Sequence, residues 1–247
     1  EPDPLEARVL VWFSCGAASA LAAKLALDKY GKGRVVVAYC DTGSEHPDNE
    51  RFLGDVERWL GITVTRLKSE KYADIWQVFS ERRYLSGPKG ALCTTEMKKI
   101  PRFGFQRPDD IQVFGYTVEE RSRADRFKAQ NFEVTLECPL IDNYLRKADC
   151  LAAIAKVGIE LPAMYRMGYR NNNCIGCVKG GMGYWNKIRV DFPEVFDRMA
   201  KQERELGASI LRKDGERVFL DELDPRAGQY KAEEAEECSL LCVSVIA

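Results

Sequence analysis

The N-terminal part of the chain alternates between short apolar runs and helical patterns, and this alternation constrains the fold more than any other feature. Apolar runs rich in β-branched residues predict strands over residues 8–13, 34–40 and 62–67. Helices are predicted between them, over residues 20–30 and from Pro47 to Leu60. Strands that alternate with helices pair in parallel through right-handed crossovers, which places helices on both faces of the sheet.

The rest of the chain extends this sheet and then changes in character. Residues 111–115 and 134–136 predict a fourth and a fifth strand, and residues 147–157 predict a helix. From about Leu161 onward, helical stretches over 183–190 and 193–206 flank a segment rich in Gly and Asn. We therefore expect an open, parallel five-stranded α/β sheet, Rossmann-like, over residues 1–160, followed by a mainly helical C-terminal lobe over residues 161–247.

Composition excludes several classes of protein. The chain carries 37 basic and 38 acidic residues, so its net charge of −1 provides no global attraction to nucleic acid or to a membrane, and any basic site must be local. No apolar run approaches the roughly 18 residues of a membrane span, and the start of the chain lacks the pattern of a signal peptide, which predicts a cytoplasmic protein with no membrane partner. His46 is the only histidine, which excludes a multi-histidine metal site.

A run of small residues joins the first predicted strand to the first predicted helix. It consists of Ser14, Cys15, Gly16, Ala17, Ala18 and Ser19. Such a turn exposes backbone N–H groups at the positive end of the helix dipole, where phosphate binds readily, and the two serine hydroxyls can add donors. A tight turn between a strand and a helix also needs small residues for purely structural reasons, so both interpretations stay open.

Two segments resemble a known family. The turn resembles the PP-loop, whose usual form is Ser-Gly-Gly-x-Asp-Ser, and the segment from Asp41 to Pro47 is similar to the Asp-Thr-Gly-x-x-x-Pro segment of phosphoadenylyl-sulfate (PAPS) reductases. The resemblance is to the PP-loop ATP pyrophosphatases, which have the adenine nucleotide alpha hydrolase-like fold. It implies that the turn binds the phosphates of ATP. It also implies that adenine and ribose lie against the end of the second strand, at Tyr39, Asp41 and Thr42.

The turn departs from the family pattern at two positions. Ala18 stands where aspartate is usual, so the resemblance leaves Asp41 or another acid to assist Mg²⁺. Cys15 stands where glycine is usual. Because a helix N-terminus stabilises a thiolate, Cys15 is either a nucleophile or a small residue that fits the turn.

A basic segment follows the predicted fourth strand. The run from Gly115 to Arg123 looks like the Gly-x-Arg-x-x-Glu-Ser segment of the reductases, with Thr117 in place of the first arginine. A run of charged residues is often only a solvated helix face. A guanidinium group, however, can bind two oxygens of one phosphate at the same time. Because ligands bind beyond the carboxyl ends of parallel strands, we expect Arg121 and Arg123 to bind phosphate or nucleic acid.

A second basic patch, formed by Lys98, Lys99 and Arg102, follows Cys93. It predicts a site for an anionic substrate or, together with Arg82 and Arg83, a stripe for a nucleic-acid backbone.

Several of the nine cysteines are candidates for a metal centre. Cys174 and Cys177 form a Cys-x-x-Cys loop, which fits a redox disulfide, half of a zinc site or half of an iron–sulfur site. Cys93 resembles the position of the Cys-Cys pair in adenylyl-sulfate reductases, which implies a third ligand. The fourth would be Cys238, with Cys242 as the alternative. Four thiolates suit a 4Fe-4S cluster or zinc, and the absence of a metal is the remaining alternative.

Three functions compete within this resemblance. In the first, ATP with Mg²⁺ adenylates an oxygen of DNA or another nucleic acid, and sulfur from a cysteine desulfurase replaces that oxygen, as in the PP-loop component of DNA phosphorothioation systems. The second is reduction of adenylyl sulfate or PAPS to sulfite by the thiol of Cys238. The third is a tRNA thiolation enzyme or a non-catalytic nucleotide-binding regulator. The expected catalytic residues are Ser14, Ser19, Asp41, Arg121 and Arg123, and Gly115 completes the expected nucleotide site.

Overall fold

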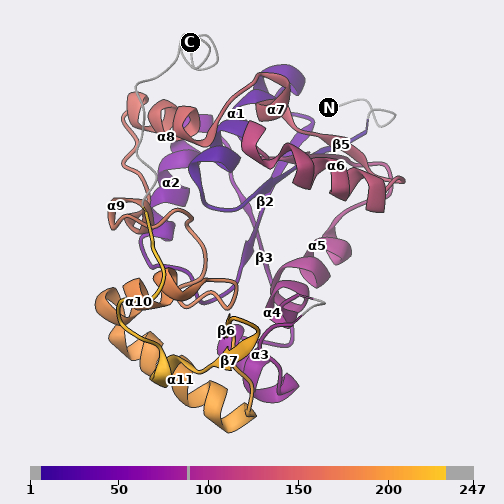
Figure 1. Ribbon diagram of the computed structural model, residues 1–247. Helices are drawn as coiled ribbons and strands as arrows, with labels where there is room; N and C mark the ends of the chain where they lie inside the picture. Colours follow the sequence, from indigo (N-terminus) through magenta and orange to yellow (C-terminus); the bar gives the residue numbers. More distant parts are fainter. Residues whose placement is uncertain (1–6, 88–89, 232–247) are drawn as a thin grey trace.

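The computed structural model describes residues 7–87 and 90–231 (Figure 1). Its central sheet has five parallel strands in the order β3-β2-β1-β4-β5, which confirms the predicted α/β fold. The strands are β1 (Val9–Phe13), β2 (Val35–Asp41), β3 (Thr65–Lys68), β4 (Ile111–Phe114) and β5 (Thr135–Glu137). The strand order reverses between β1 and β4, so the loops that follow these two strands diverge and open a crevice at the carboxyl edge of the sheet.

The central strand β1 is apolar throughout because both of its faces are covered. Val9, Val11 and Phe13 belong to the main core, on the α1 side of the sheet, whereas Leu10 and Trp12 lie in a smaller apolar cluster on the opposite face. All five side chains are buried. A strand buried on both faces reads as a continuous apolar run, which is why the sequence predicted it.

Helices cover both faces of the sheet, as expected. The main core includes residues of α1 (Ala17–Tyr30), α2 (Asn49–Leu60), α7 (Pro139–Asp142) and α8 (Lys147–Lys156). The opposite side carries α5 (Ile100–Phe105), whose Phe105 packs on the smaller cluster, and α6 (Arg121–Gln130), whose Phe127 ring lies 5.0 Å from that of Phe114. In Figure 1, α5 and α6 lie on the same side of the sheet.

A second hydrophobic core lies below the sheet in the view of Figure 1. It draws on two stretches that are far apart in sequence, one from Tyr72 to Met97 and one from Met164 to Leu223. Its elements are α3 (Ile75–Arg82), α4 (Leu92–Thr94), the π-helical η1 (Thr95–Lys99), α9 (Ala163–Arg166), α10 (Met182–Asp191), α11 (Pro193–Leu206), β6 (Leu211–Lys213), β7 (Glu216–Val218) and η3 (Leu220–Glu222). Near its centre, Trp185 and Met199 are fully buried.

Two local features differ from the sequence prediction or were missed by it. Helix α1 begins at Ala17 rather than at residue 20, which places Ser19 inside its first turn. The β6–β7 hairpin was not predicted. Asp214 and Gly215 form its turn, and both have positive φ angles, of 52° and 88°. An Asp-Gly pair between two short strands is the usual signal for such a hairpin.

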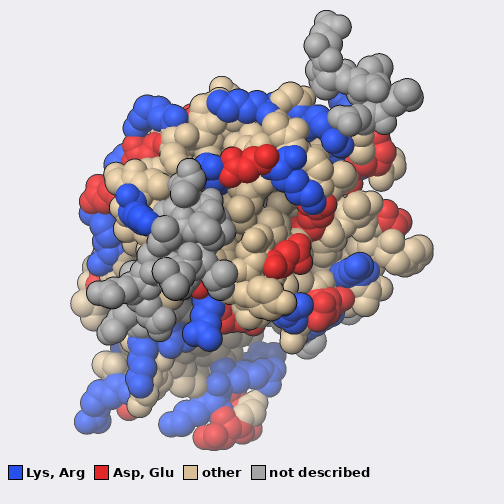
Figure 2. Space-filling model, turned by 90° about the horizontal axis from the view of Figure 1, so that it is seen from above, with Lys and Arg blue, Asp and Glu red and all other residues tan. Residues whose placement is uncertain are grey.

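Within the described ranges, no helix combines the length and the apolar character that crossing a membrane requires. Figure 2 shows Lys and Arg side chains interspersed with Asp and Glu over the face seen from above, in keeping with the net charge of −1.

Candidate active site

The turn between β1 and α1 is held together by the hydroxyl group of Ser19. This oxygen accepts hydrogen bonds from the backbone N–H of Ser14 at 3.0 Å and from that of Gly16 at 3.4 Å, and it donates to the carbonyl of Gly16 at 3.0 Å. The Ser14 hydroxyl lies 3.1 Å from it and is more exposed. The first turn of α1 contains no acidic residue. Its N-terminal dipole therefore attracts an anion without competition from a carboxylate of the same turn.

Gly115 brings the end of β4 against this turn. A Cβ atom at position 115 would lie 2.8 Å from the Cα of Ser19, 2.9 Å from its backbone nitrogen and 3.0 Å from the carbonyl carbon of Ala18. Only glycine permits this approach without a shift of the backbone. The end of β4 thus lies directly against the first turn of α1 at the predicted phosphate site.

A cleft of about 730 Å³ opens at this edge of the sheet. Its volume is within the usual range for small-molecule sites. The cleft is lined by seven basic side chains, Lys98, Lys99, Arg102, Arg123, Arg126, Lys147 and Lys179, and by two acidic ones, Glu119 and Glu120. The chain as a whole is nearly neutral, so this local excess of positive charge marks the cleft as a site for an anionic ligand.

The predicted nucleotide-binding residues divide into two groups. Those that line the cleft are Ser14, Gly16, Ala18, Ser19, Tyr39 and Gly115. Those that do not are Cys15, Ala17, Asp41 and Thr42. Of the two arginines expected to be catalytic, Arg123 lines the cleft and pairs with Glu120 at 2.7 Å, whereas Arg121 is exposed and does not line it.

Asp41 lies at the end of β2 with both carboxylate oxygens engaged. It accepts a hydrogen bond from the Gly43 backbone N–H at 2.9 Å and pairs with Lys68 at 3.0 Å. Burial by itself would raise the pKa of Asp41, but the Gly43 N–H and Lys68 outweigh it and lower the pKa. Asp41 therefore stays ionised. Its carboxylate lies next to the cleft and does not line it.

The buried carboxylate of Glu45 connects three segments around the cleft. It accepts hydrogen bonds from the Tyr39 hydroxyl at 2.6 Å and from Asn49 Nδ2 at 2.9 Å, and it lies 3.4 Å from Lys98 Nζ. Burial and the charge of Glu45 both raise the pKa of Tyr39, so this hydroxyl remains a donor. Burial opposes the charged form of Lys98, but Glu45 outweighs it and raises the Lys98 pKa, which keeps a cation in the cleft wall.

Cys15 fills the turn and is not poised as a nucleophile. Its φ angle is 57°, in the left-handed region that favours glycine, and its side chain is fully buried. Its sulfur lies 3.4 Å from the Asn49 carbonyl oxygen. Burial raises the thiol pKa well above its ordinary value, with repulsion from Glu45 adding to the effect. Of the two interpretations of Cys15, the structure favours the small residue that fits the turn.

Replacing Cys15 by glycine is therefore expected to preserve the ATP turnover that the resemblance to the PP-loop enzymes implies. Glycine adopts the positive φ angle without strain, so pyrophosphate release should stay within about threefold of wild type. Initial rates measured on the two purified proteins test this. Complete loss of turnover in a folded Cys15→Gly protein would restore the nucleophile interpretation.

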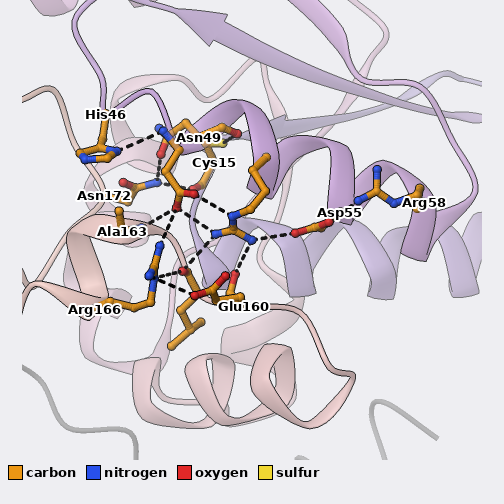
Figure 3. Close-up of polar contacts among 12 residues, drawn as sticks. Cys15, His46, Asn49, Asp55, Arg58, Glu160, Ala163, Arg166 and Asn172 are labelled. Carbon is orange, nitrogen blue, oxygen red and sulfur yellow. Dashed lines mark hydrogen bonds and ion pairs between the residues drawn. The ribbon is translucent and has the colours of Figure 1, made fainter.

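Asn172 connects the loop before the Cys-x-x-Cys pair to the turn from Ser14 to Ser19, which is called the phosphate turn below because it is the predicted phosphate site. Its Nδ2 atom donates to the carbonyl oxygen of Cys15 at 2.6 Å and to Oδ1 of Asn49 at 2.8 Å (Figure 3). Two further contacts join the same loop to the end of β2: Cys174 Sγ lies 3.0 Å from Thr42 Oγ1, and the Ile175 N–H donates to Ser44. The cysteine loop therefore lies directly against the predicted nucleotide edge.

Three predicted metal ligands lie in the described part of the chain: Cys93 and Cys174 pack on the second core, and Cys177 lines a second cavity together with Cys174. Cys177 lies close enough to Cys93 and Cys174 to raise the pKa of each by charge repulsion, in addition to the larger effect of burial, which raises the pKa of Cys174 to about 12. The Tyr184 hydroxyl accepts the backbone N–H of Cys177 at 3.0 Å. Within residues 7–87 and 90–231, however, no group of three or more His, Cys, Asp or Glu side chains is arranged to hold a metal ion. Cys238 and Cys242 lie outside the described residues, so the metal centre stays a prediction.

A second cavity, of about 660 Å³, adjoins the cysteine loop. Cys174 and Cys177 line it, and Asn171, Asn173 and Lys179 line both this cavity and the cleft at the carboxyl edge of the sheet. The two spaces therefore meet at the loop that carries the Cys-x-x-Cys pair.

An ion-pair network anchors the start of α2 to α9 (Figure 3). Asp48 pairs with Arg51 at 2.7 Å, accepts the Ala163 backbone N–H at 2.8 Å and lies 3.4 Å from Arg166. The hydrogen bonds from Arg51, together with the Ala163 N–H, outweigh burial and lower the Asp48 pKa to about 2. This carboxylate holds together two segments that lie more than a hundred residues apart.

The Asp48 contacts are expected to make the α9 segment sensitive to acid. Because the folded-state pKa of Asp48 is lowered, its stabilisation is present above about pH 4 and is lost as the pH falls towards about 2. Amide hydrogen exchange, corrected for intrinsic rates, should show weaker protection at Ala163 at about pH 2.5 than at about pH 5. An Asp48→Asn variant should lack this pH dependence. Equal protection of the wild type at both pH values would contradict the prediction.

Sequence analysis missed Glu45 and Asn172 as parts of the site. Glu45 lies within the segment that resembles the reductases, at one of its variable positions. Asn172 lies in the run Asn171-Asn172-Asn173 just before the Cys-x-x-Cys pair, and this run of amides was the available signal. What each side chain binds follows only from the fold.

No family model matches the chain. Its sequence is similar to an uncharacterized protein of Methanocaldococcus jannaschii, with 24% identity over 215 residues. The match covers 82% of this chain but 43% of the relative, so the chain spans less than half of that protein's length.

Proposed function

We propose that this protein is an ATP pyrophosphatase that adenylates a nucleic-acid oxygen for sulfur incorporation, in the manner of DNA phosphorothioation, with a cysteine desulfurase as sulfur donor. One observation carries the proposal. The turn from Ser14 to Ser19 lies at the N-terminus of α1, against Gly115, and opens on a basic cleft at the reversal in strand order. This is the arrangement expected of a site for the phosphates of a nucleotide.

In the proposed reaction, an acceptor oxygen attacks the α-phosphorus of ATP. A new P–O bond forms, the bond between the α-phosphorus and the bridging oxygen breaks, and pyrophosphate leaves. Negative charge grows on the departing pyrophosphate. The amide groups at the start of α1 and the Ser14 hydroxyl are fixed before the reaction by the bonds around Ser19, and Lys98 supplies a cation in the wall.

Mg²⁺ would neutralise charge on the phosphate oxygens when bound. Asp41, the acid expected from the sequence, does not line the cleft. Glu119 and Glu120 are the carboxylates that do line it. Oxygen ligands of this kind suit Mg²⁺, so we favour these two glutamates over Asp41 as its protein contacts.

The test is pyrophosphate release from ATP by anaerobically purified protein, with sulfite formation from adenylyl sulfate measured on the same sample. Release of pyrophosphate without sulfite supports adenylation. Sulfite without pyrophosphate supports the second candidate, the reductase, for which the contact of the Cys-x-x-Cys loop with the end of β2 is the favouring observation. Binding of ATP with neither product would indicate a nucleotide-binding regulator.

We further propose that Cys93, Cys174 and Cys177 hold a 4Fe-4S cluster, with Cys238 or Cys242 as the fourth ligand. The support for this ligand set is that Cys93 and Cys174 pack on the same hydrophobic core and that Cys174 and Cys177 line the same cavity. Anaerobically purified protein should then contain iron and acid-labile sulfide and should absorb visible light. Cys174→Ser should lose all three properties, whereas Cys150→Ser, at a buried cysteine of the main core, should keep them. Zinc in place of iron, or no metal at all, would contradict the proposal.

A further inference from the structure

The cleft continues past the phosphate turn to the opposite face of β1, where Arg102 lies against two aromatic rings. The Arg102 guanidinium carbon lies 4.7 Å from the centroid of the Trp12 ring and 4.8 Å from that of Phe114. Trp12 belongs to the apolar cluster on the α5 side of the sheet, whereas the next residue, Phe13, packs on the α1 side. Arg102 and the phosphate turn therefore lie on opposite sides of β1 and line one continuous cleft.

Arg102 has no acceptor for its N–H groups in the described part of the chain. Its Nε atom is buried without a hydrogen-bond partner, and none of the described carboxylates pairs with its guanidinium group. The aromatic rings make cation–π contacts with the face of the guanidinium group. They do not accept hydrogen bonds from its N–H groups, which point outward in the guanidinium plane. Burial lowers the pKa of Arg102, and the charges of Cys40 and Tyr116 do not offset this effect. A partly buried guanidinium group in this state is stabilised by an anionic ligand.

Further cations lie along the same cleft. Lys99, at the end of η1, and Arg126, on α6, line it, and neither forms an ion pair within the described ranges. Aromatic side chains lie among them, namely Trp12, Phe114, Tyr116 and Phe127. Unpaired cations that line one cleft suit a chain of phosphates that carries bases, because the phosphates bind the cations and a base can stack on the partly exposed ring of Phe127.

We infer that Arg102 forms a phosphodiester-binding subsite in a groove for single-stranded nucleic acid, which runs from the phosphate turn between α5 and α6. The inference rests on the proposed function, because it identifies where the acceptor of that reaction binds. Trp12, which packs on Arg102, and Ser14 are two residues apart, or about 7 Å along a strand. A strand held at Arg102 can therefore place a neighbouring group at the phosphate turn.

Two binding measurements on the full chain test this subsite. One is the fluorescence anisotropy of a labelled single-stranded DNA oligonucleotide, and the other is calorimetric titration with ATP. Arg102→Gln removes the charge and should weaken oligonucleotide binding about tenfold or more, and it should lower the slope of log affinity against log salt by about 0.7. ATP affinity should change by less than about twofold, since the phosphate turn is intact. Arg107→Gln is the matched control, because Arg107 is exposed, follows α5 and does not line the cleft.

A second variant keeps the test decisive if Arg102→Gln fails to fold. Arg126→Gln changes an exposed side chain of α6 and should weaken the oligonucleotide severalfold. Unchanged oligonucleotide binding in both variants would overturn the inference. So would an equal loss of ATP and oligonucleotide affinity in Arg102→Gln, because Arg102 would then belong to the nucleotide site. Oligonucleotide binding that depends on Arg102, in a protein that releases no pyrophosphate, would support the groove and contradict the proposed function alone.

Discussion

Replacing Gly115 by alanine is expected to remove nearly all pyrophosphate release from ATP. The added Cβ would lie 2.8 Å from Ser19 Cα and 2.9 Å from its backbone nitrogen. Neither atom can rotate away, because both belong to the backbone of the first turn of α1. The end of β4 and α1 must therefore move apart, at a cost of about 1–3 kcal/mol in the free energy of unfolding. A shift of this size at the reacting centre should lower kcat/KM for ATP about a hundredfold.

The matched control is Gly104→Ala. Gly104 lies in α5, its φ angle is not positive, and no atom lies within 4 Å of the Cβ that alanine would add. This variant should keep the wild-type rate, and its stability should be equal or slightly higher because alanine favours a helix. Denaturant unfolding and initial rates measured on all three proteins separate the two effects. A Gly115→Ala protein that turns over ATP at the wild-type rate would show that the nucleotide does not bind at this turn.

Replacing Asn172 by alanine is expected to weaken both the fold and the proposed nucleotide site. The change removes the donor to the Cys15 carbonyl oxygen and to Asn49 Oδ1, both of which lie in a buried environment. A buried polar group left without its partner costs about 1–3 kcal/mol, and two acceptors lose theirs here. The Cys15 carbonyl belongs to a residue at positive φ, so its loss of support should also disorder the phosphate turn.

Asn173→Ala provides the comparison for Asn172→Ala. Asn173 is the next residue in the same loop, but its side chain is exposed, and replacing it should change the unfolding free energy by less than about 0.5 kcal/mol. We expect ATP affinity to fall about tenfold or more in Asn172→Ala; because Asn173 itself lines the cleft, Asn173→Ala serves as the comparison for stability only. Calorimetric titration with ATP, together with denaturant unfolding, measures both quantities. An Asn172→Ala protein that binds ATP as tightly as the wild type would show that the contact to Cys15 does not support the site.

The sheet could be predicted because its strands are short apolar runs bounded by turn residues. The run at Val9–Phe13 is buried on both faces, so it could be recognised without knowledge of its neighbours. The first three residues of the predicted third strand, 62–64, lie outside it, since β3 begins only at Thr65 and its side chains are at most half-buried. Element boundaries of this kind depend on which backbone groups pair with the adjacent strand.

The candidate site was predicted in part, because the carboxyl ends of parallel strands meet at one edge. Ser14, Ser19 and Gly115 come together for this reason. The same argument placed Asp41 and Arg121 near the ligand, but neither lines the cleft. Their side-chain directions depend on local partners, such as Lys68 for Asp41, and periodicity carries no information about those partners.

The sequence by itself determined the parallel α/β sheet, the small-residue turn that begins α1 and the loop that carries two cysteines. Each depends on residues adjacent in the chain, so local propensity and hydrophobic pattern were sufficient. Only the tertiary structure decided that Asn172 holds the carbonyl of Cys15, 157 residues away, and that Arg102 lies across β1 from the phosphate turn. Such contacts arise when separate elements pack, and many sequences with the same local pattern would pack them with different side chains in contact.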